Sequence, residues 1–130
     1  MHARRIVVTL TAAALVVATA PAVDAHHRPR LYCSPSGDVC QSVTKVGGLR
    51  KLRIHTAAQY FEVFQLCVYS HRKDYEWCAP YELRQRAGGT WGRSVAWFKQ
   101  WPSMRHRGAF TVSWWDGDTR IGRKLGLHRR

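Results

Sequence analysis

From Val39 onward, the chain is made of short runs rich in Val, Thr, Tyr, Phe and Trp, which turn-forming residues separate. Runs of this length and composition are typical of β-strands. The pattern predicts seven strands, over residues 39–46, 49–56, 60–70, 75–85, 91–101, 109–115 and 120–128. The Asp116-Gly117 pair is a strong hairpin signal, and only Thr56–Tyr60 has the composition of a helical turn. Short strands joined by turns favour one antiparallel β-sandwich.

Alternation within the runs predicts the faces of the strands. In 49–55, Lys51, Arg53 and His55 share one face, and apolar residues occupy most of the other. Segment 61–69 is apolar on both faces, as expected of a strand that is covered on both sides.

The N-terminus has a different pattern. Arg4 and Arg5 precede the apolar run Ile6–Ala18, and small residues follow it up to Ala25. This order predicts a secretory signal peptide over residues 1–25, cleaved after Ala25 or, as an alternative, after residue 20. The run is too short to span a bilayer, so we expect no transmembrane anchor in the mature form. The expected location is secreted and extracellular.

Removal of this segment would leave 105 of the 130 residues, enough for one small domain. We expect a basic arm and the start of a disulfide loop over residues 26–38, and the sandwich over 39–130. The loss of Arg4, Arg5 and Asp24 lowers the formal net charge from +13 to +12. We expect the mature protein to be a monomer.

Four cysteines, Cys33, Cys40, Cys67 and Cys78, lie in the mature part. An even number in a small exported chain predicts disulfides, and three pairings are possible. Turn formers between the first two cysteines, and a polar turn between the strand-like runs that carry the last two, favour Cys33–Cys40 and Cys67–Cys78. Neither spacing is Cys-x-x-Cys, which disfavours a zinc site or thiol redox chemistry.

The last third of the chain contains the motif Gly108-Ala-Phe-Thr-Val-Ser-Trp114, then Asp116-Gly117, then Ile121-Gly-Arg-Lys-Leu125. This series resembles the last two strands of immunoglobulin-like sandwiches. The segment Cys-Ser-Pro-Ser-Gly-Asp-Val-Cys at 33–40 is similar to small uncharacterised secreted proteins of high-GC Gram-positive bacteria. The resemblance implies an immunoglobulin-like fold and export, but no biochemical activity. Phe110 replaces the tyrosine common in such domains, and no cysteine stands at Trp114 for an intersheet disulfide.

Tryptophans and basic residues are the candidate binding chemistry. Trp91, Trp97 and Trp101 share one face of their run and are expected to fill the core. Trp114 and Trp115 are adjacent and must point to opposite faces, so we expect Trp115, beside the turn, to contact a ligand. The basic residues expected to bind are Arg50, Lys51, Arg53, Arg105, Arg107, Arg123 and Lys124.

This composition favours a non-catalytic module that binds anionic cell-envelope polymers or a protein partner. Nucleic acid is a less favoured partner, because no recognition motif is present. We find no motif for hydrolysis, no nucleophile elbow and no phosphate-binding loop, and we expect no cofactor.

Two alternatives remain open. Cleavage after Ala25 would expose His26 as an N-terminal copper ligand, and the protein would then be a copper protein or a small extracellular enzyme. The candidates for a second copper ligand are His55, His71, His106 and His128. The other alternative is a secreted inhibitor or effector that acts on a protein.

Overall fold

A computed structural model describes residues 29–46, 49–97 and 106–130. This part of the chain is all-β, and it contains no helix that could cross a membrane. The expected signal peptide and His26 lie outside the described residues, as do Trp101 and Arg105.

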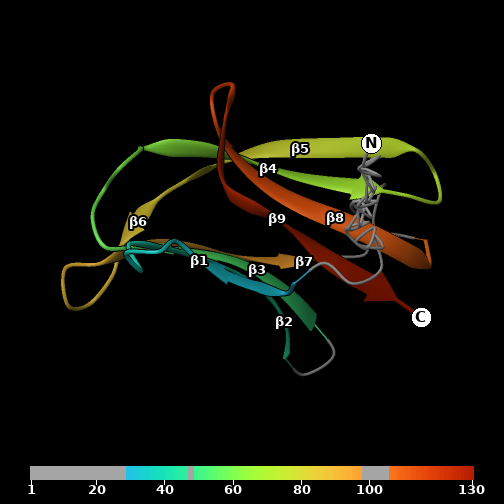
Figure 1. Cartoon of the computed structure of the whole chain (residues 1–130), viewed down its shortest axis with the longest axis horizontal. Helices are drawn as coiled ribbons and strands as arrows, with labels where there is room; N and C mark the ends of the chain where they lie inside the picture. Colours follow the sequence, from blue (N-terminus) through green and yellow to red (C-terminus); the bar gives the residue numbers. More distant parts are fainter. Residues whose placement is uncertain (1–28, 47–48, 98–105) are drawn as a thin grey trace, which may run out of the picture.

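The strands form two antiparallel sheets that lie as two layers (Figure 1). The five-stranded sheet has the order β1-β2-β3-β7-β6, with bounds β1 Leu31–Cys33, β2 Val39–Val46, β3 Leu49–Thr56, β7 Trp91–Trp97 and β6 Arg84–Gln85. The four-stranded sheet has the order β5-β4-β8-β9, with bounds β5 Tyr75–Glu82, β4 Val63–Ser70, β8 Gly108–Asp116 and β9 Thr119–Arg129.

Most strands lie where the sequence pattern predicts them, although β4 begins at Val63 rather than at residue 60, and residues 98–101 of the predicted strand 91–101 lie outside the described residues. β1 was not expected. The run 75–85 divides into β5 and β6 because Leu83 is buried between them, where its N–H donates to the carbonyl of Glu62 at 2.8 Å. The predicted helical turn at Thr56–Tyr60 is wrong: the Thr56 hydroxyl donates to the carbonyl of Ala58 at 2.7 Å and caps no helix.

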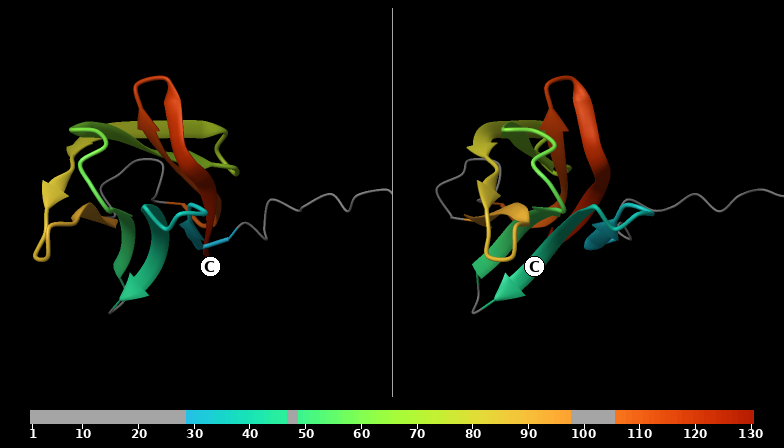
Figure 2. Two further views of the ribbon diagram at one scale, coloured as in Figure 1. Left: turned by 60° about the vertical axis from the view of Figure 1, so that its left-hand side comes forward. Right: turned by 90° about the vertical axis from the view of Figure 1, so that its left-hand side faces the viewer.

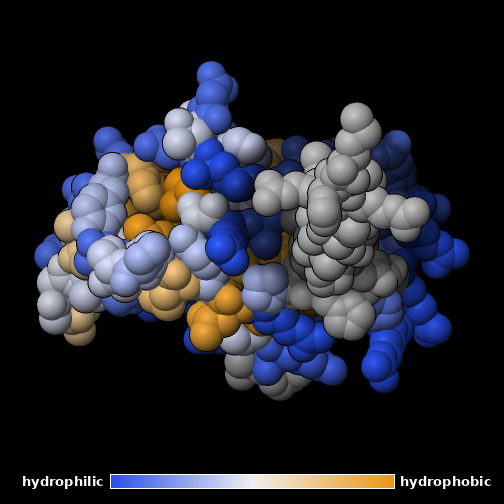
Figure 3. All heavy atoms as spheres, in the orientation of Figure 1, coloured by the Kyte–Doolittle hydropathy of each residue, from blue (hydrophilic) through white to orange (hydrophobic). Residues whose placement is uncertain are grey.

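The core lies between the sheets. Its largest fully buried side chain is Trp114 of β8, and the rings of Trp97 and Phe110 meet across the layers at a centroid distance of 5.2 Å. Trp91 packs against this core and is half-buried. In the space-filling view, the visible apolar residues gather in the left-hand half of the molecule, among hydrophilic residues (Figure 3). The core positions expected for Trp91 and Trp97 are therefore confirmed.

Both predicted disulfides are present, Cys33–Cys40 and Cys67–Cys78. Each joins two residues that face each other directly in neighbouring antiparallel strands, with 4.1 Å between their Cα atoms. Each therefore staples two strands of a single sheet and does not connect the layers.

The two layers are joined along one side, where β9 runs beside β1 and β2 (Figure 2). The buried Gln41 of β2 makes the connection: its Nε2 donates to the carbonyl of Ile121 at 2.8 Å, and its Oε1 accepts the N–H of Arg123 at 3.1 Å. Gly122 between them has φ +61°, and any side chain there would collide with Gln41. The register of β8 and β9 shifts close to this point.

Candidate anion-binding groove

The outer face of the five-stranded sheet is set by the alternation along β3. Leu52 and Ile54 point inward and are buried, so Lys51, Arg53 and His55 point away from the core, as the sequence predicts. The antiparallel register places Ser42 and Ser94 on either side of Arg53, on β2 and β7. The same face also carries the Cys33–Cys40 disulfide, because Cys40 pairs with His55.

A groove of about 460 Å³ opens on this face. Its lining residues are Leu31, Cys40, Gln41, Ser42, Lys51, Arg53, Ile54, His55, Arg86 and Ser94. None of these residues is Asp or Glu, and Lys51, Arg53 and Arg86 are basic. The groove therefore has the electrostatics of an anion site.

The groove lining contains no carboxylate because of where Asp and Glu occur along the chain. The sequences of β1, β2, β3, β6 and β7 contain no Asp or Glu. Most described acids lie in or beside strands of the four-stranded sheet, and Asp38 sits in the turn before β2. Uniform positive charge on one face is thus a property of its strand sequences.

Arg86 reaches the groove from a tight turn. Its backbone N–H donates to the carbonyl of Thr90 at 2.7 Å, and Gly88 and Gly89 take the positive φ angles of +85° and +78° that reverse the chain. The Arg86 side chain then passes over Gly92 of β7, where an added Cβ would come within 2.9 Å of its Nε atom. Gly92 pairs with His55, so Arg86 approaches the His55 end of the groove.

Arg50 and Arg123, which were expected to bind ligand, lie outside the groove lining and contact aromatic rings. The Arg50 guanidinium lies 5.1 Å from the ring centre of Trp97, and its Nη2 donates to the carbonyl of His128 at 2.8 Å. Burial, and then the charges of neighbouring arginines, lower the pKa of Arg50. Arg123 lies 5.4 Å from the ring centre of Tyr32. Both side chains serve contacts within the fold.

Lys124 and Trp115 belong to the outer face of the other sheet, and the exposed Arg107 comes just before β8 of that sheet. Trp115 is half-buried, and its indole N–H donates to the Ser113 hydroxyl at 2.9 Å. The predicted cationic and aromatic surface is therefore divided between the two outer faces of the molecule. Of the predicted basic residues, the groove contains Lys51 and Arg53.

A smaller cavity of about 300 Å³ lies on the outer face of the four-stranded sheet. It is lined by Tyr69, His71, Glu76, Thr111, Ser113 and Lys124. The His71 Nε2 atom lies 2.6 Å from the Thr111 hydroxyl oxygen, and the ring of Tyr69 packs against the imidazole. The Tyr69 hydroxyl donates to Asp74, and this hydrogen bond, together with burial and nearby acidic charge, raises the pKa of Tyr69. This cavity therefore contains both a cation, Lys124, and a carboxylate, Glu76. Its His71 and Thr111 side chains are hydrogen-bonded to each other.

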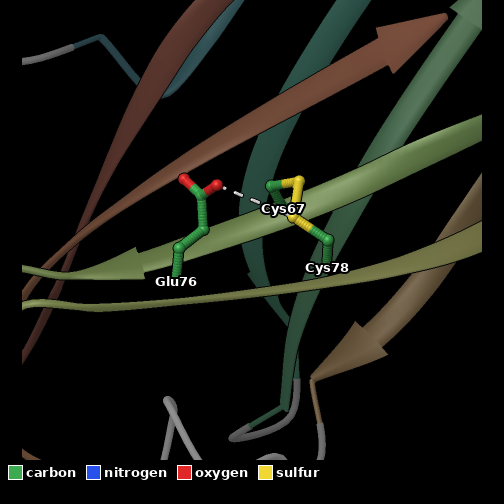
Figure 4. A group of neighbouring side chains, drawn as sticks. All are labelled: Cys67, Glu76 and Cys78. Atoms are coloured by element: carbon green, nitrogen blue, oxygen red, sulfur yellow. Dashed lines mark hydrogen bonds between the residues drawn. A yellow bond between two sulfur atoms is a disulfide. The ribbon is translucent and has the colours of Figure 1, made fainter. Parts of the chain in front are cut away.

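Cys67, Glu76 and Cys78 are the described His, Cys, Asp and Glu residues that come close enough together to suggest a metal site (Figure 4). The two cysteine sulfurs are joined in a disulfide, so they offer no thiolate. A disulfide sulfur also has no proton to donate, so its 3.7 Å approach to the Glu76 carboxylate is a packing contact. This trio does not fit a metal ion.

Two basic residues, Arg93 and Arg86, take positions that the sequence analysis did not single out. Arg93 points between the layers, with its guanidinium 5.6 Å from the ring centre of Tyr81. Burial raises the pKa of Tyr81, and the nearby positive charge of Arg93 opposes that rise. Arg86 is not among the basic residues that the sequence analysis expects to bind. The Gly88-Gly89 turn and Gly92 are the sequence signals that could have placed it.

Comparison of the chain with protein-family models, with curated proteins and with solved structures finds no match.

Proposed function

We propose that this protein is an exported, non-catalytic binding module that captures a linear anionic polymer of the cell envelope in the groove of its five-stranded sheet. The observation that carries the proposal is the set Lys51, Arg53 and Arg86, which lines one groove with no carboxylate among its lining residues. Electrostatic attraction would bring the polymer to this face, and salt would weaken the binding.

Two further observations support an exported immunoglobulin-like module. The order β2-β3-β7-β6 in one sheet and β5-β4-β8-β9 in the other corresponds to the order A-B-E-D and C′-C-F-G of immunoglobulin-like sandwiches. Two disulfides in a small domain fit an oxidising compartment outside the cytoplasm.

Retention on immobilised dextran sulfate over a sodium chloride series tests the groove. The purified, disulfide-bonded protein is compared with a triple variant, Lys51→Gln, Arg53→Gln and Arg86→Gln. The matched control is Arg72→Gln, Lys73→Gln and Arg130→Gln, which removes three exposed cations outside the groove lining. Both triple variants lose the same net charge, so the comparison separates a local site from general attraction.

We expect the groove variant to lose about tenfold or more in affinity and to elute at lower salt, because polyanion affinity depends on the number of contacting cations. The control should elute close to the unaltered protein. Equal losses in the two variants would contradict the proposal, as would a failure of the unaltered protein to bind at low salt.

A further inference from the structure

We propose that the polymer is a linear poly(polyol phosphate) that lies extended along β3, with about one negative charge every 7 Å. This inference rests on the proposed function and names the substrate class of the same groove. It follows from the spacing of the cations, from the position of Arg86 and from the side chains that accompany them.

The spacing comes from strand geometry. Lys51 and Arg53 are two residues apart on one face of β3, which corresponds to about 6.7 Å along the strand. His55 takes the next position at the same interval. Lys and Arg residues of β3 therefore occupy two of three equally spaced positions on this face.

Arg86 supplies the third charge. Its side chain lies over Gly92, and Gly92 is the residue of β7 that pairs with His55. The three cations therefore accompany three successive outer-face positions of β3, at residues 51, 53 and 55, which span about 13 Å. A phosphodiester polymer with a three-carbon polyol in each unit repeats at a similar interval when extended, whereas the charges of a polyphosphate chain are less than half as far apart.

The accompanying side chains favour phosphate over an isolated carboxylate. At the middle position, Ser42 and Ser94 lie on either side of Arg53, on the neighbouring strands. Their hydroxyls can donate hydrogen bonds to the free oxygens of a phosphodiester, while the Arg53 guanidinium offers two parallel N–H groups.

The same lining disfavours a single-stranded nucleic acid. Proteins that bind such strands combine a basic track with aromatic side chains on which the bases stack. The described lining of this groove includes no Phe, Tyr or Trp, and Trp115 lies on the outer face of the other sheet. A polymer without bases fits the groove better.

Calorimetric titration of the disulfide-bonded protein with short oligomers tests the spacing. The probes are glycerol-phosphate dimers and trimers, tripolyphosphate and the oligonucleotide (dT)₄. We expect the glycerol-phosphate trimer to bind about tenfold tighter than tripolyphosphate, although tripolyphosphate is more densely charged. In a plot of log affinity against log salt concentration, the affinity of the glycerol-phosphate trimer should fall with a slope of about 2. This slope comes from three contacts on a single-stranded polyanion at about 0.7 each.

Single substitutions test the third cation position, which Arg86 supplies. Arg86→Gln should reduce trimer affinity to the level of the dimer and lower the salt slope by about 0.7, because one of three contacts is lost. It should change dimer affinity by only about twofold, since Lys51 and Arg53 still provide two adjacent sites. Lys73→Gln, which removes an exposed charge from the turn between β4 and β5, should alter neither affinity.

Three results would overturn the inference. They are tripolyphosphate binding at least as tightly as the trimer, (dT)₄ binding tighter than the trimer, or no binding of any phosphate oligomer. Each would leave the proposed function standing if dextran sulfate is still retained through the groove cations. Loss of the proposed function would instead show as an unchanged dextran sulfate affinity in the triple groove variant.

Discussion

The two outer faces of this molecule contain similar residue types but differ in how their charges are arranged. On the five-stranded sheet, Lys51, Arg53 and Arg86 share a groove whose lining has no acid. On the four-stranded sheet, Lys124 shares a cavity with Glu76, and His71 is bonded to Thr111. A cation can attract a distant anion only when no local carboxylate offsets it. In the proposed function, the polymer is attracted by the grouping of cations on one face rather than by the total charge of the chain.

The largest expected effect concerns the two hydrogen bonds by which Gln41 of β2 connects with β9 of the other sheet. Gln41→Leu would remove both hydrogen bonds to β9 and leave the Ile121 carbonyl and the Arg123 N–H without their partner. We expect the free energy of unfolding to fall by about 2–6 kcal/mol, from about 1–3 kcal/mol for each of the two orphaned groups. Urea denaturation measures this loss as a lower midpoint with an unchanged m-value.

The matched control is Gln65→Leu, because Gln65 is exposed on the outer face of β4. It should change the free energy of unfolding by less than about 0.5 kcal/mol. If the two variants were equally stable, the Gln41 bridge would not be what joins the layers.

The next effect compares the two faces directly. Lys51→Glu places a carboxylate in the groove, whereas Lys124→Glu makes the same change of charge on the opposite face. We expect the first variant to bind dextran sulfate about tenfold or more weakly, which is about 1.4 kcal/mol per factor of ten. The second should remain within about twofold of the unaltered protein. Binding isotherms at constant salt give both values, and equal losses would mean that the faces act as one.

A smaller effect should appear only on the outer face of the four-stranded sheet, which we call the mixed face because its cavity contains both Lys124 and Glu76. Thr111 is buried, and its hydroxyl oxygen lies 2.6 Å from the His71 Nε2 atom. Thr111→Val keeps the shape of the side chain but removes this hydrogen bond, so we expect a loss of about 1 kcal/mol in stability. Urea denaturation measures the loss, and dextran sulfate affinity should stay unchanged. A large loss of polyanion binding would contradict the separation of the two faces.

Local signals made most of the fold predictable. Alternation and turn residues placed the strands, because the side-chain period of a strand is a property of neighbouring residues. Both disulfides were predictable for the same reason: each closes a short loop between adjacent antiparallel strands. The division of 75–85 at Leu83 was not predictable, because it depends on where the chain crosses from one sheet to the other.

The candidate site was less predictable, because it depends on which strands become neighbours. Lys51 and Arg53 follow from alternation in β3 alone. Arg86 joins them only because β3 pairs with β7, and because Gly92 of β7 has no side chain to occupy the space where the Arg86 side chain lies. Conversely, the contact between the Arg50 guanidinium and the ring of Trp97 could not be predicted from β3 alone, because Trp97 is distant in sequence. Tertiary contacts therefore determine which of the many basic side chains remain available to a ligand.

The smallest effect is a pH dependence confined to the mixed face. Tyr69 donates its hydroxyl proton to Asp74, and this bond raises the pKa of Tyr69 above its ordinary value of 10.0. The stability that the bond contributes is fully present below pH 10 and is lost as pH rises through the raised pKa, because the phenolate can no longer donate. Tyr69→Phe should therefore unfold at a midpoint that falls less steeply above pH 10 than that of the unaltered protein. Tyr81, whose pKa is also raised, is present in both proteins, so its contribution cancels from the difference. Parallel midpoints across this range would show that the Asp74 bond adds nothing to the stability of this face.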